Sequence, residues 1–202
     1  MVEGIVFPAT IPHRVEGPIA HVFNLVTGNG HIENRGVLLF EQALKIGAHC
    51  IVCLGMASEA SGFRIEQVTR NRVCNERYCP EFPPKSRISS AYNYNDTLSI
   101  SLRRWDLHGF AKVCRREQLA VPVTYSEDPG GFCCNHLMWQ LAEAQEGHVN
   151  RYDHISWIFM HVPCCHEALP VPPTEFLGLG KTVISKERLI EGTQRFVELT
   201  RI

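Results

Sequence analysis

The sequence has no long hydrophobic run and no excess of charge of either sign. It contains no stretch of about 18 apolar residues, the length that a membrane-spanning helix needs. With 20 Lys and Arg against 21 Asp and Glu, the net charge is -1, which gives no electrostatic basis for binding nucleic acid or an anionic membrane. The first residues lack a basic segment followed by an apolar one, so no secretory signal is predicted and we expect a cytoplasmic protein.

The sequence also lacks internal repeats, low-complexity tracts and any linker-like segment that would divide it. Its 202 residues suffice for one domain of ordinary size, and 45% hydrophobic with 20% charged residues is typical of a folded chain. We therefore expect residues 1–202 to form a single domain.

Cysteine, by contrast, is abundant: there are nine, an odd number. Because no secretory signal precedes them, we interpret them as reduced thiols. Most are expected to be small, buried hydrophobic residues.

Hydrophobic periodicity predicts helices that alternate with strands. Helices are expected before Gly47, over roughly 96–116, from Cys134 onward, and after an N-cap at Ser185. Strands are expected over 49–56, 121–126 and 154–163. This alternation indicates an α/β fold, a sandwich of helices around a mostly parallel sheet.

In such sheets, functional sites lie beyond the carboxyl ends of the strands. The turn after the strand 121–126 carries Cys133 and Cys134. His161 and Glu66 each lie at or after the end of another predicted strand. Three strand ends therefore offer cysteine, histidine and glutamate side chains.

The segment DPGGFCCNHLMWQLAEA places two adjacent cysteines where a glycine turn becomes a helix. A cysteine in the first turn of a helix faces unpaired backbone N–H groups and the positive end of the helix dipole. Both favour the thiolate, and the N–H groups can stabilise an oxyanion. One hypothesis is therefore that Cys134 is a catalytic nucleophile. The other interpretation is a pair of buried structural thiols.

Two further chemistries remain open for these thiols. Seven Cys and His residues in CCNH and HVPCCH could bind a metal: Cys133, Cys134, His136, His161, Cys164, Cys165 and His166. No two pairs among the cysteines and histidines match a known zinc spacing, which weakens that hypothesis. A disulfide between adjacent cysteines would be strained, and a reducing compartment disfavours it.

Three segments of the chain read GGFCCNHLMWQL, WIFMHVP and CIVCLGMASEASGFRIEQVTRNRVCN. They resemble sequence blocks of the pyroglutamyl peptidase I family. The family's blocks typically read AGTYVCNHLMYxLL, GFIHVP and LGQAGGRxxITxERxAxN. The closing segment SKERLIEGTQRFVEL is similar to the family's last helix, so the resemblance covers roughly residues 48–199.

The resemblance implies a three-layer α/β/α sandwich and a cysteine peptidase with a Cys–His–Glu triad. Cys134 corresponds to the nucleophile, His161 to the general base, and Glu66 to the group that orients the imidazole. The implied reaction removes an N-terminal pyroglutamyl (5-oxoproline) residue through a thioester, without a metal or organic cofactor. The implied substrates are small peptides with a blocked N-terminus, and the implied assembly is a homo-oligomer.

The sequence departs from the family near the expected substrate pocket. It has no counterpart of the family's N-terminal loop, typically VTGFxPFGG, whose aromatic residues hold the pyrrolidone ring. Within the matching blocks, Cys133, Met56 and Asn71 are expected to contact the substrate, and Met56 stands where the family has Gln. The alternative function is therefore a weak or inactive homologue that acts as a binding or scaffold protein.

Overall fold

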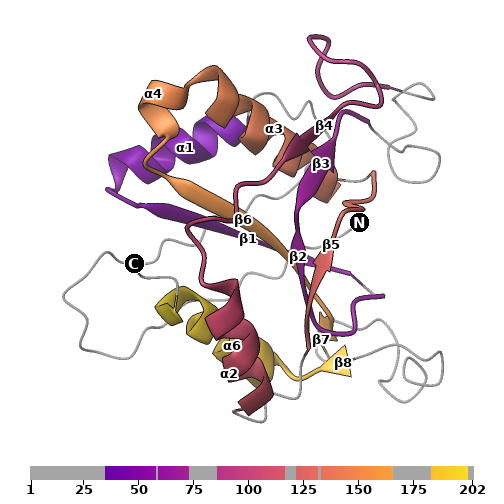
Figure 1. Ribbon diagram of the computed structural model, residues 1–202, viewed down its shortest axis with the longest axis vertical. Helices are drawn as coiled ribbons and strands as arrows, with labels where there is room; N and C mark the ends of the chain where they lie inside the picture. Colours follow the sequence, from indigo (N-terminus) through magenta and orange to yellow (C-terminus); the bar gives the residue numbers. More distant parts are fainter. Residues whose placement is uncertain are drawn as a thin grey trace.

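Helices cover both faces of a central four-stranded sheet in the computed structural model (Figure 1). The structure describes residues 35–57, 59–72, 86–116, 122–131, 133–165 and 183–199. The sheet consists of β1 (Cys50–Met56), β2 (Phe63–Glu66), β5 (Val123–Ser126) and β6 (Ser156–Val162), in the order β1-β6-β2-β5. One face carries α1 (Arg35–Lys45), α3 (Cys133–Gly147) and α4 (Val149–Tyr152), and the other carries α2 (Leu107–Arg116) and α6 (Lys186–Leu199). The predicted three-layer sandwich is confirmed.

Two smaller sheets flank this sandwich. The antiparallel pair of β3 (Val68–Arg70) and β4 (Thr97–Ser99) lies beside α3. The parallel pair of β7 (Cys164–Cys165) and β8 (Val183–Ile184) follows β6 and precedes α6. None of the described helices is both long and apolar enough to cross a membrane.

The central sheet is mostly parallel, as predicted, but one antiparallel junction divides it. β1 runs parallel to β6, and β2 runs parallel to β5. β2 and β6, in the middle of the sheet, are antiparallel to each other. The carboxyl ends of the four strands therefore do not meet at one common edge.

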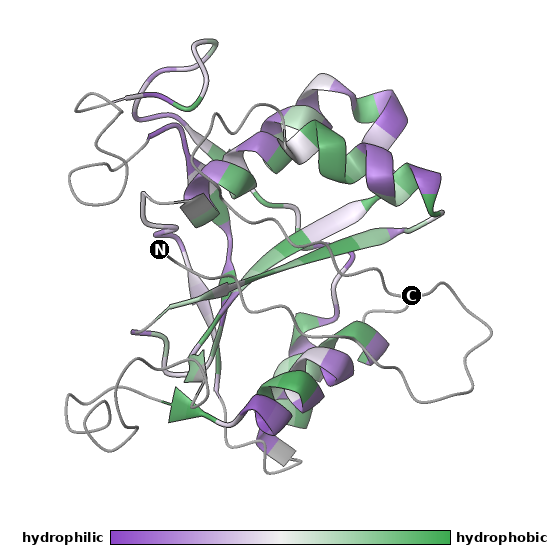
Figure 2. Cartoon of the chain, turned by 180° about the vertical axis from the view of Figure 1, so that it is seen from behind, coloured by the Kyte–Doolittle hydropathy of each residue, from purple (hydrophilic) through white to green (hydrophobic). Residues whose placement is uncertain are grey.

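Side chains of β6 alternate between the two layers of helices, as the two-residue period of a strand requires. Trp157 and Phe159 join the core beneath α1 and α3, while Ile158 and Met160 join the core beneath α2 and α6. Burial on both faces explains why the sequence of this strand is almost continuously hydrophobic. In Figure 2 the long central strands carry the hydrophobic colours, and hydrophilic residues are interspersed along the helices.

The structure confirms most of the predicted elements near their expected ends. α1 is followed by Gly47, whose φ of +67° suits a residue without a side chain. Ser185 precedes α6, and its Oγ accepts a hydrogen bond from the backbone N–H of Arg188 at 3.4 Å. Of the residues of β1 only Cys53 is buried, because β1 is an outer strand of the described sheet.

The helix predicted over 96–116 is wrong in its first half. Residues 97–99 form β4 instead, and Leu98 is buried between exposed neighbours, which is the two-residue period of a strand. α2 begins only at Leu107, after Asp106, whose Oδ1 accepts a hydrogen bond from the backbone N–H of Gly109 at 2.8 Å. Asp106 is therefore the N-cap that the sequence analysis did not identify.

The packing of α1 on α3 depends on a glycine. A Cβ atom added at Gly36 would lie 2.1 Å from the backbone oxygen of Gln140, so the two helices could not keep their separation. We expect Gly36→Ala to lower the free energy of unfolding by about 1–3 kcal/mol, although alanine alone favours helix. Urea denaturation measures this change.

Gly147→Ala in α3 is the matched control. No atom lies within 4 Å of a Cβ placed at Gly147, so this substitution is expected to leave the stability unchanged or raise it by up to about 1 kcal/mol. Equal effects of the two substitutions would contradict the close approach of α1 and α3.

Candidate active site

His161 and Glu66 form a hydrogen bond in the interior of the protein. The Nδ1 atom of His161 lies 2.7 Å from the Oε1 atom of Glu66. The exposed fractions of the two residues are 5% and 0%. An ionised carboxylate can only accept, so the imidazole donates through Nδ1–H. Its Nε2 atom is then the nitrogen that can take up a proton.

The sheet geometry brings these two residues together on the face covered by α3. His161 is two residues beyond Phe159 on β6, so both side chains lie on the α3 side. On β2, Phe63 and Ile65 belong to the core on the opposite side, which places Glu66 on the α3 side as well. The antiparallel register of β2 and β6 brings these two short segments into contact.

This arrangement corrects the predicted strand-end geometry. Glu66 is not in the loop after β1 but is the last residue of β2, a strand that the sequence analysis missed. Because β2 and β6 are antiparallel, Glu66 and His161 meet along the junction between two strands. They do not meet at a shared carboxyl edge.

Cys134, the second residue of α3, lies against the same part of the sheet. A Cβ atom added at Gly55 would lie 3.1 Å from the Sγ atom of Cys134 and 2.9 Å from the ring of Phe159. Gly55 on β1 is paired with His161 on β6. The thiol therefore lies over the residue that neighbours His161 in the sheet, and the absence of a side chain at Gly55 makes room for it.

Asn135 fastens the first turn of α3 to β3. This residue is fully buried, and its Nδ2 atom donates to the carbonyl oxygens of Arg70 at 2.8 Å and Arg72 at 3.0 Å. Its Oδ1 atom accepts from the backbone N–H of Arg70 at 2.9 Å and from Oγ1 of Thr69 at 3.0 Å. The sequence analysis assigned Asn135 no role, although a polar residue next to a candidate nucleophile was visible.

A second set of contacts orders the turn between β5 and α3. Arg70 donates from Nη1 to Oδ1 of Asp128 and from Nη2 to the carbonyl oxygen of Glu127, both at 3.0 Å. The side chain of Asp128 is 73% exposed, so this ion pair contributes little stability. Gly130, with φ of +73°, completes the turn in a conformation that favours glycine.

The residues expected to contact the substrate differ in their surroundings. Met56, at the end of β1, is 39% exposed and is available for contact. Cys133 begins α3, and its side chain lies outside the described part of the structure. Asn71 is fully buried, and its amide bonds to the backbone of Ser89, Tyr92 and Asn93. These bonds hold that loop in place, and a contact of Asn71 with the substrate stays a prediction.

The other hypotheses for the cysteines find no support within the described residues. No group of three or more Cys, His, Asp or Glu side chains there is arranged to hold a metal ion. The side chains of three members of the proposed set of ligands, Cys133, Cys165 and His166, fall outside the described part of the structure. The cysteines with described side chains are all outside disulfide bonds: Cys50, Cys53, Cys114, Cys134 and Cys164.

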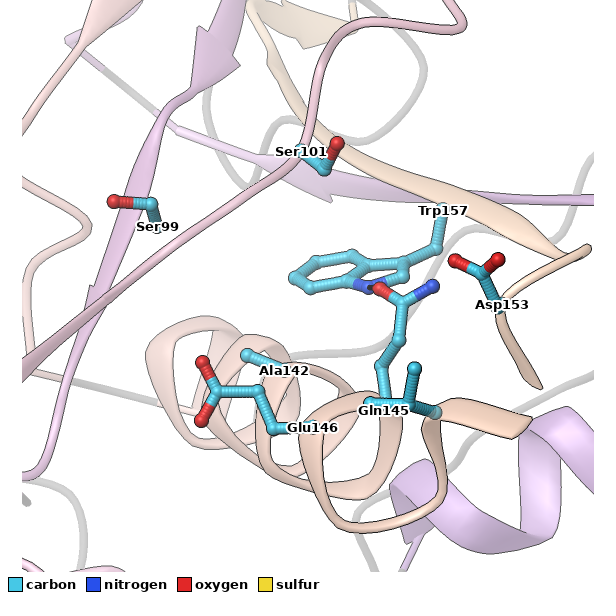
Figure 3. A pocket seen from close by; sticks show the side chains of 8 residues that line it. Ser99, Ser101, Ala142, Gln145, Glu146, Asp153 and Trp157 are labelled. Carbon is cyan, nitrogen blue, oxygen red and sulfur yellow. Dashed lines mark hydrogen bonds between the residues drawn. The ribbon is translucent and has the colours of Figure 1, made fainter. Parts of the chain in front are cut away.

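A pocket with a volume of about 220 Å³ lies elsewhere (Figure 3). Its walls include Glu146, Asp153 and Trp157, and the indole of Trp157 donates to Oε1 of Gln145 at 2.9 Å. Trp157 is near the start of β6, whereas His161 is near its end. None of Cys134, His161 and Glu66 lines this pocket, so it is separate from the candidate active site.

The chain is similar in sequence and fold to characterised peptidases. It is 26% identical over 168 residues to a pyrrolidone-carboxylate peptidase of Bacillus cereus (strain AH820), covering 81% of this chain and 69% of that protein. Among solved structures, pyroglutamyl peptidase I from Bacillus amyloliquefaciens aligns with a TM-score of 0.63 and 20% identity, over 83% of this chain and 73% of that one.

The likeness extends to a hyperthermophile. The pyrrolidone carboxyl peptidase of Pyrococcus furiosus aligns with a TM-score of 0.61 and 18% identity, over 82% of this chain and 74% of that one. No family model matches the chain. At such identities the structural likeness shows the fold, and the sequence match is a similarity to a pyrrolidone-carboxylate peptidase.

The thiols should differ in reactivity. Burial raises the pKa of the Cys53 thiol to about 12, so almost none of it is the reactive thiolate at neutral pH. With iodoacetamide at about pH 8, we expect Cys134 to be alkylated well before Cys53 and Cys114, as mapped by mass spectrometry. Urea-unfolded protein is the control, because every thiol should react there. Labelling of Cys53 as fast as Cys134 in folded protein would contradict this assignment.

The same pKa shift predicts a loss of stability in alkaline solution. The Cys53 thiol has a pKa of 9.0 when solvated and about 12 when folded, so unfolding releases its proton between these values. Its contribution to stability is present below about pH 9 and decreases by up to about 1.4 kcal/mol per pH unit as the pH rises toward 12. In Cys53→Val, where the side chain cannot ionise, the free energy of unfolding measured by urea denaturation should fall less steeply with pH. The same slope in both proteins would contradict this prediction.

Proposed function

We propose that the chain, which is similar in sequence and fold to pyroglutamyl peptidase I, is a cysteine peptidase that removes an N-terminal pyroglutamyl residue from peptides. The observation that carries this proposal is the buried hydrogen bond between His161 and Glu66, next to Gly55, over which the Cys134 thiol lies. A nucleophile, a base and an orienting carboxylate are the three parts that acyl transfer requires.

In the first half of the proposed reaction, His161 takes the thiol proton of Cys134 at Nε2. The thiolate attacks the carbonyl carbon of the pyroglutamyl residue and forms a tetrahedral oxyanion. The proposed donors to that negative charge are backbone N–H groups at the start of α3, which is the positive end of the helix dipole. The C–N bond then breaks, the leaving amine takes the proton from His161, and a thioester on Cys134 remains.

In the second half, His161 acts again as a base. It takes a proton from water, the resulting hydroxide attacks the thioester, and the C–S bond breaks. Free pyroglutamate leaves, and the proton on His161 returns to the Cys134 thiolate. Glu66 stabilises the imidazolium at both stages by accepting from Nδ1–H.

The proposed substrates are small peptides whose N-terminus is blocked by the lactam ring. Met56 and Cys133 remain proposed contacts for this group. Met56 ends β1 immediately after Gly55, and Cys133 directly precedes the proposed nucleophile. The CH₂ groups of the lactam ring suit the partly exposed Met56 side chain.

Hydrolysis of pyroglutamyl-7-amino-4-methylcoumarin under reducing conditions tests the proposal. Cys134→Ala is expected to abolish turnover, and Glu66→Gln to lower kcat by about 100-fold or more because the imidazole loses its charged partner. Cys50→Ala, at an exposed thiol at the start of β1, is the matched control and should retain activity.

If no turnover is observed, alkylation of Cys134 distinguishes an enzyme with another substrate from an inactive homologue. In one case, the folded protein fails to hydrolyse this substrate while Cys134 is still alkylated selectively. That result would indicate a reactive nucleophile that acts on a different acyl group. Absence of both turnover and selective alkylation would overturn the proposal in favour of an inactive homologue.

A further inference from the structure

Arg64 lies against both members of the His–Glu pair. Its Nε atom donates to Oε1 of Glu66 at 3.0 Å, and its Nη2 atom is 3.4 Å from Nδ1 of His161. Arg64 is two residues before Glu66 on β2 and is paired with His161 across the β2–β6 junction. All three side chains therefore project from the sheet on the α3 side. The sequence analysis did not single out Arg64.

The carboxylate of Glu66 depends on these two neighbours. Glu66 is fully buried, and within the described part of the chain its Oε2 atom has no hydrogen-bond partner. Oε1 alone receives both hydrogen bonds, from Arg64 and from His161. Burying an ionised carboxylate is costly unless a positive charge and donors accompany it. When the imidazole is neutral, Arg64 is the cation that supplies this compensation.

We propose that Arg64 is a positioning residue that keeps Glu66 an ionised acceptor and thereby holds His161 as the Nδ1–H tautomer, with Nε2 unprotonated and available to Cys134. Without Arg64, Glu66 can carry a proton and donate it to Nδ1. The imidazole would then hold its single proton on Nε2, where it could not accept the thiol proton of Cys134. Arg64 thus determines the tautomer of His161 through Glu66, without a direct hydrogen bond to the imidazole.

The two distances around Nδ1 support this division of roles. The Nη2 atom of Arg64 can only donate a hydrogen bond, so it can bond to Nδ1 of His161 only when Nδ1 carries no proton. The distance from Nδ1 to Glu66 is 2.7 Å, against 3.4 Å to Arg64, so the carboxylate is the partner of Nδ1. Arg64 therefore acts on His161 through Glu66. The side chain of Arg64 is only 23% exposed, so its charge is partly shielded from solvent.

The first test, which rests on the proposed peptidase function, compares the steady-state kinetics of Arg64→Met and Arg64→Lys. Arg64→Met removes the cation and is expected to lower kcat at least about tenfold, with KM changed by less than about twofold. Arg64→Lys keeps a cation beside Glu66 and should recover most of this loss. Arg195→Met on α6, where Arg195 pairs with exposed Glu198, is the matched control and should behave as the unmodified protein.

The second test does not depend on any substrate. Nitrogen NMR of protein labelled in its histidine rings reports which nitrogen carries the proton, and His161→Asn assigns the signal among the ten histidines. We expect the Nδ1–H form in the unmodified protein and in Arg64→Lys, and loss of that form in Arg64→Met. This measurement needs no turnover. It therefore tests the role of Arg64 even if the protein does not catalyse the proposed peptidase reaction.

Two results would overturn the role assigned to Arg64. One is an unchanged Nδ1–H signal in Arg64→Met, whatever the turnover. The other is an equal loss of the signal in Arg64→Lys and Arg64→Met while circular dichroism shows both to be folded. If Arg64→Met does not fold, Arg64→Gln, which is neutral but can still donate, replaces it and is expected to lose the Nδ1–H form too.

Discussion

Burial of β6 on both faces is the constraint on which the rest of the structure depends. Its alternate side chains supply the hydrophobic contacts for two layers of helices, so the strand cannot shift by one residue without exchanging both cores. His161 occupies one of these buried positions, and a polar ring there is tolerated only with a hydrogen-bond partner. The same packing that stabilises the fold therefore fixes the position and direction of the imidazole.

The buried polar residues of the described chain form separate hydrogen-bonded groups on neighbouring elements. Glu66 and His161 bond to each other across the β2–β6 junction. Asn135, in the first turn of α3, bonds to Thr69 on β3, and Asn71, directly after β3, bonds to the backbone of residues 89–93. These bonds fix how β2, β3, β6 and α3 meet, because each unsatisfied buried group would be costly.

Sequence reasoning found the parts of the site that a short local pattern encodes. Cys134 was visible because a glycine turn leads into an amphipathic helix, and His161 because it ends a hydrophobic run. Glu66 was identified through a resemblance, since nothing in its own segment predicts the four-residue strand that carries it. Arg64 was missed because its role depends on a register that joins residues 97 positions apart. The prediction of a helix over 96–116 was wrong in its first half. The three-residue alternation of β4 is too short to be recognised beside the longer helical pattern that follows it.

Gly55 shows how the candidate chemistry constrains the sheet itself. The glycines with positive φ in the described chain are Gly47 and Gly130, so the backbone of Gly55 is open to any residue. What excludes a side chain there is the volume that the Cys134 thiol and the Phe159 ring already occupy. Losing the thiol alone would not admit a side chain at Gly55, because the Phe159 ring would still lie 2.9 Å from its Cβ atom. A larger residue at this position in a homologue would therefore imply that both neighbours, the thiol on the helix and the aromatic ring on the adjacent strand, had shifted or been replaced.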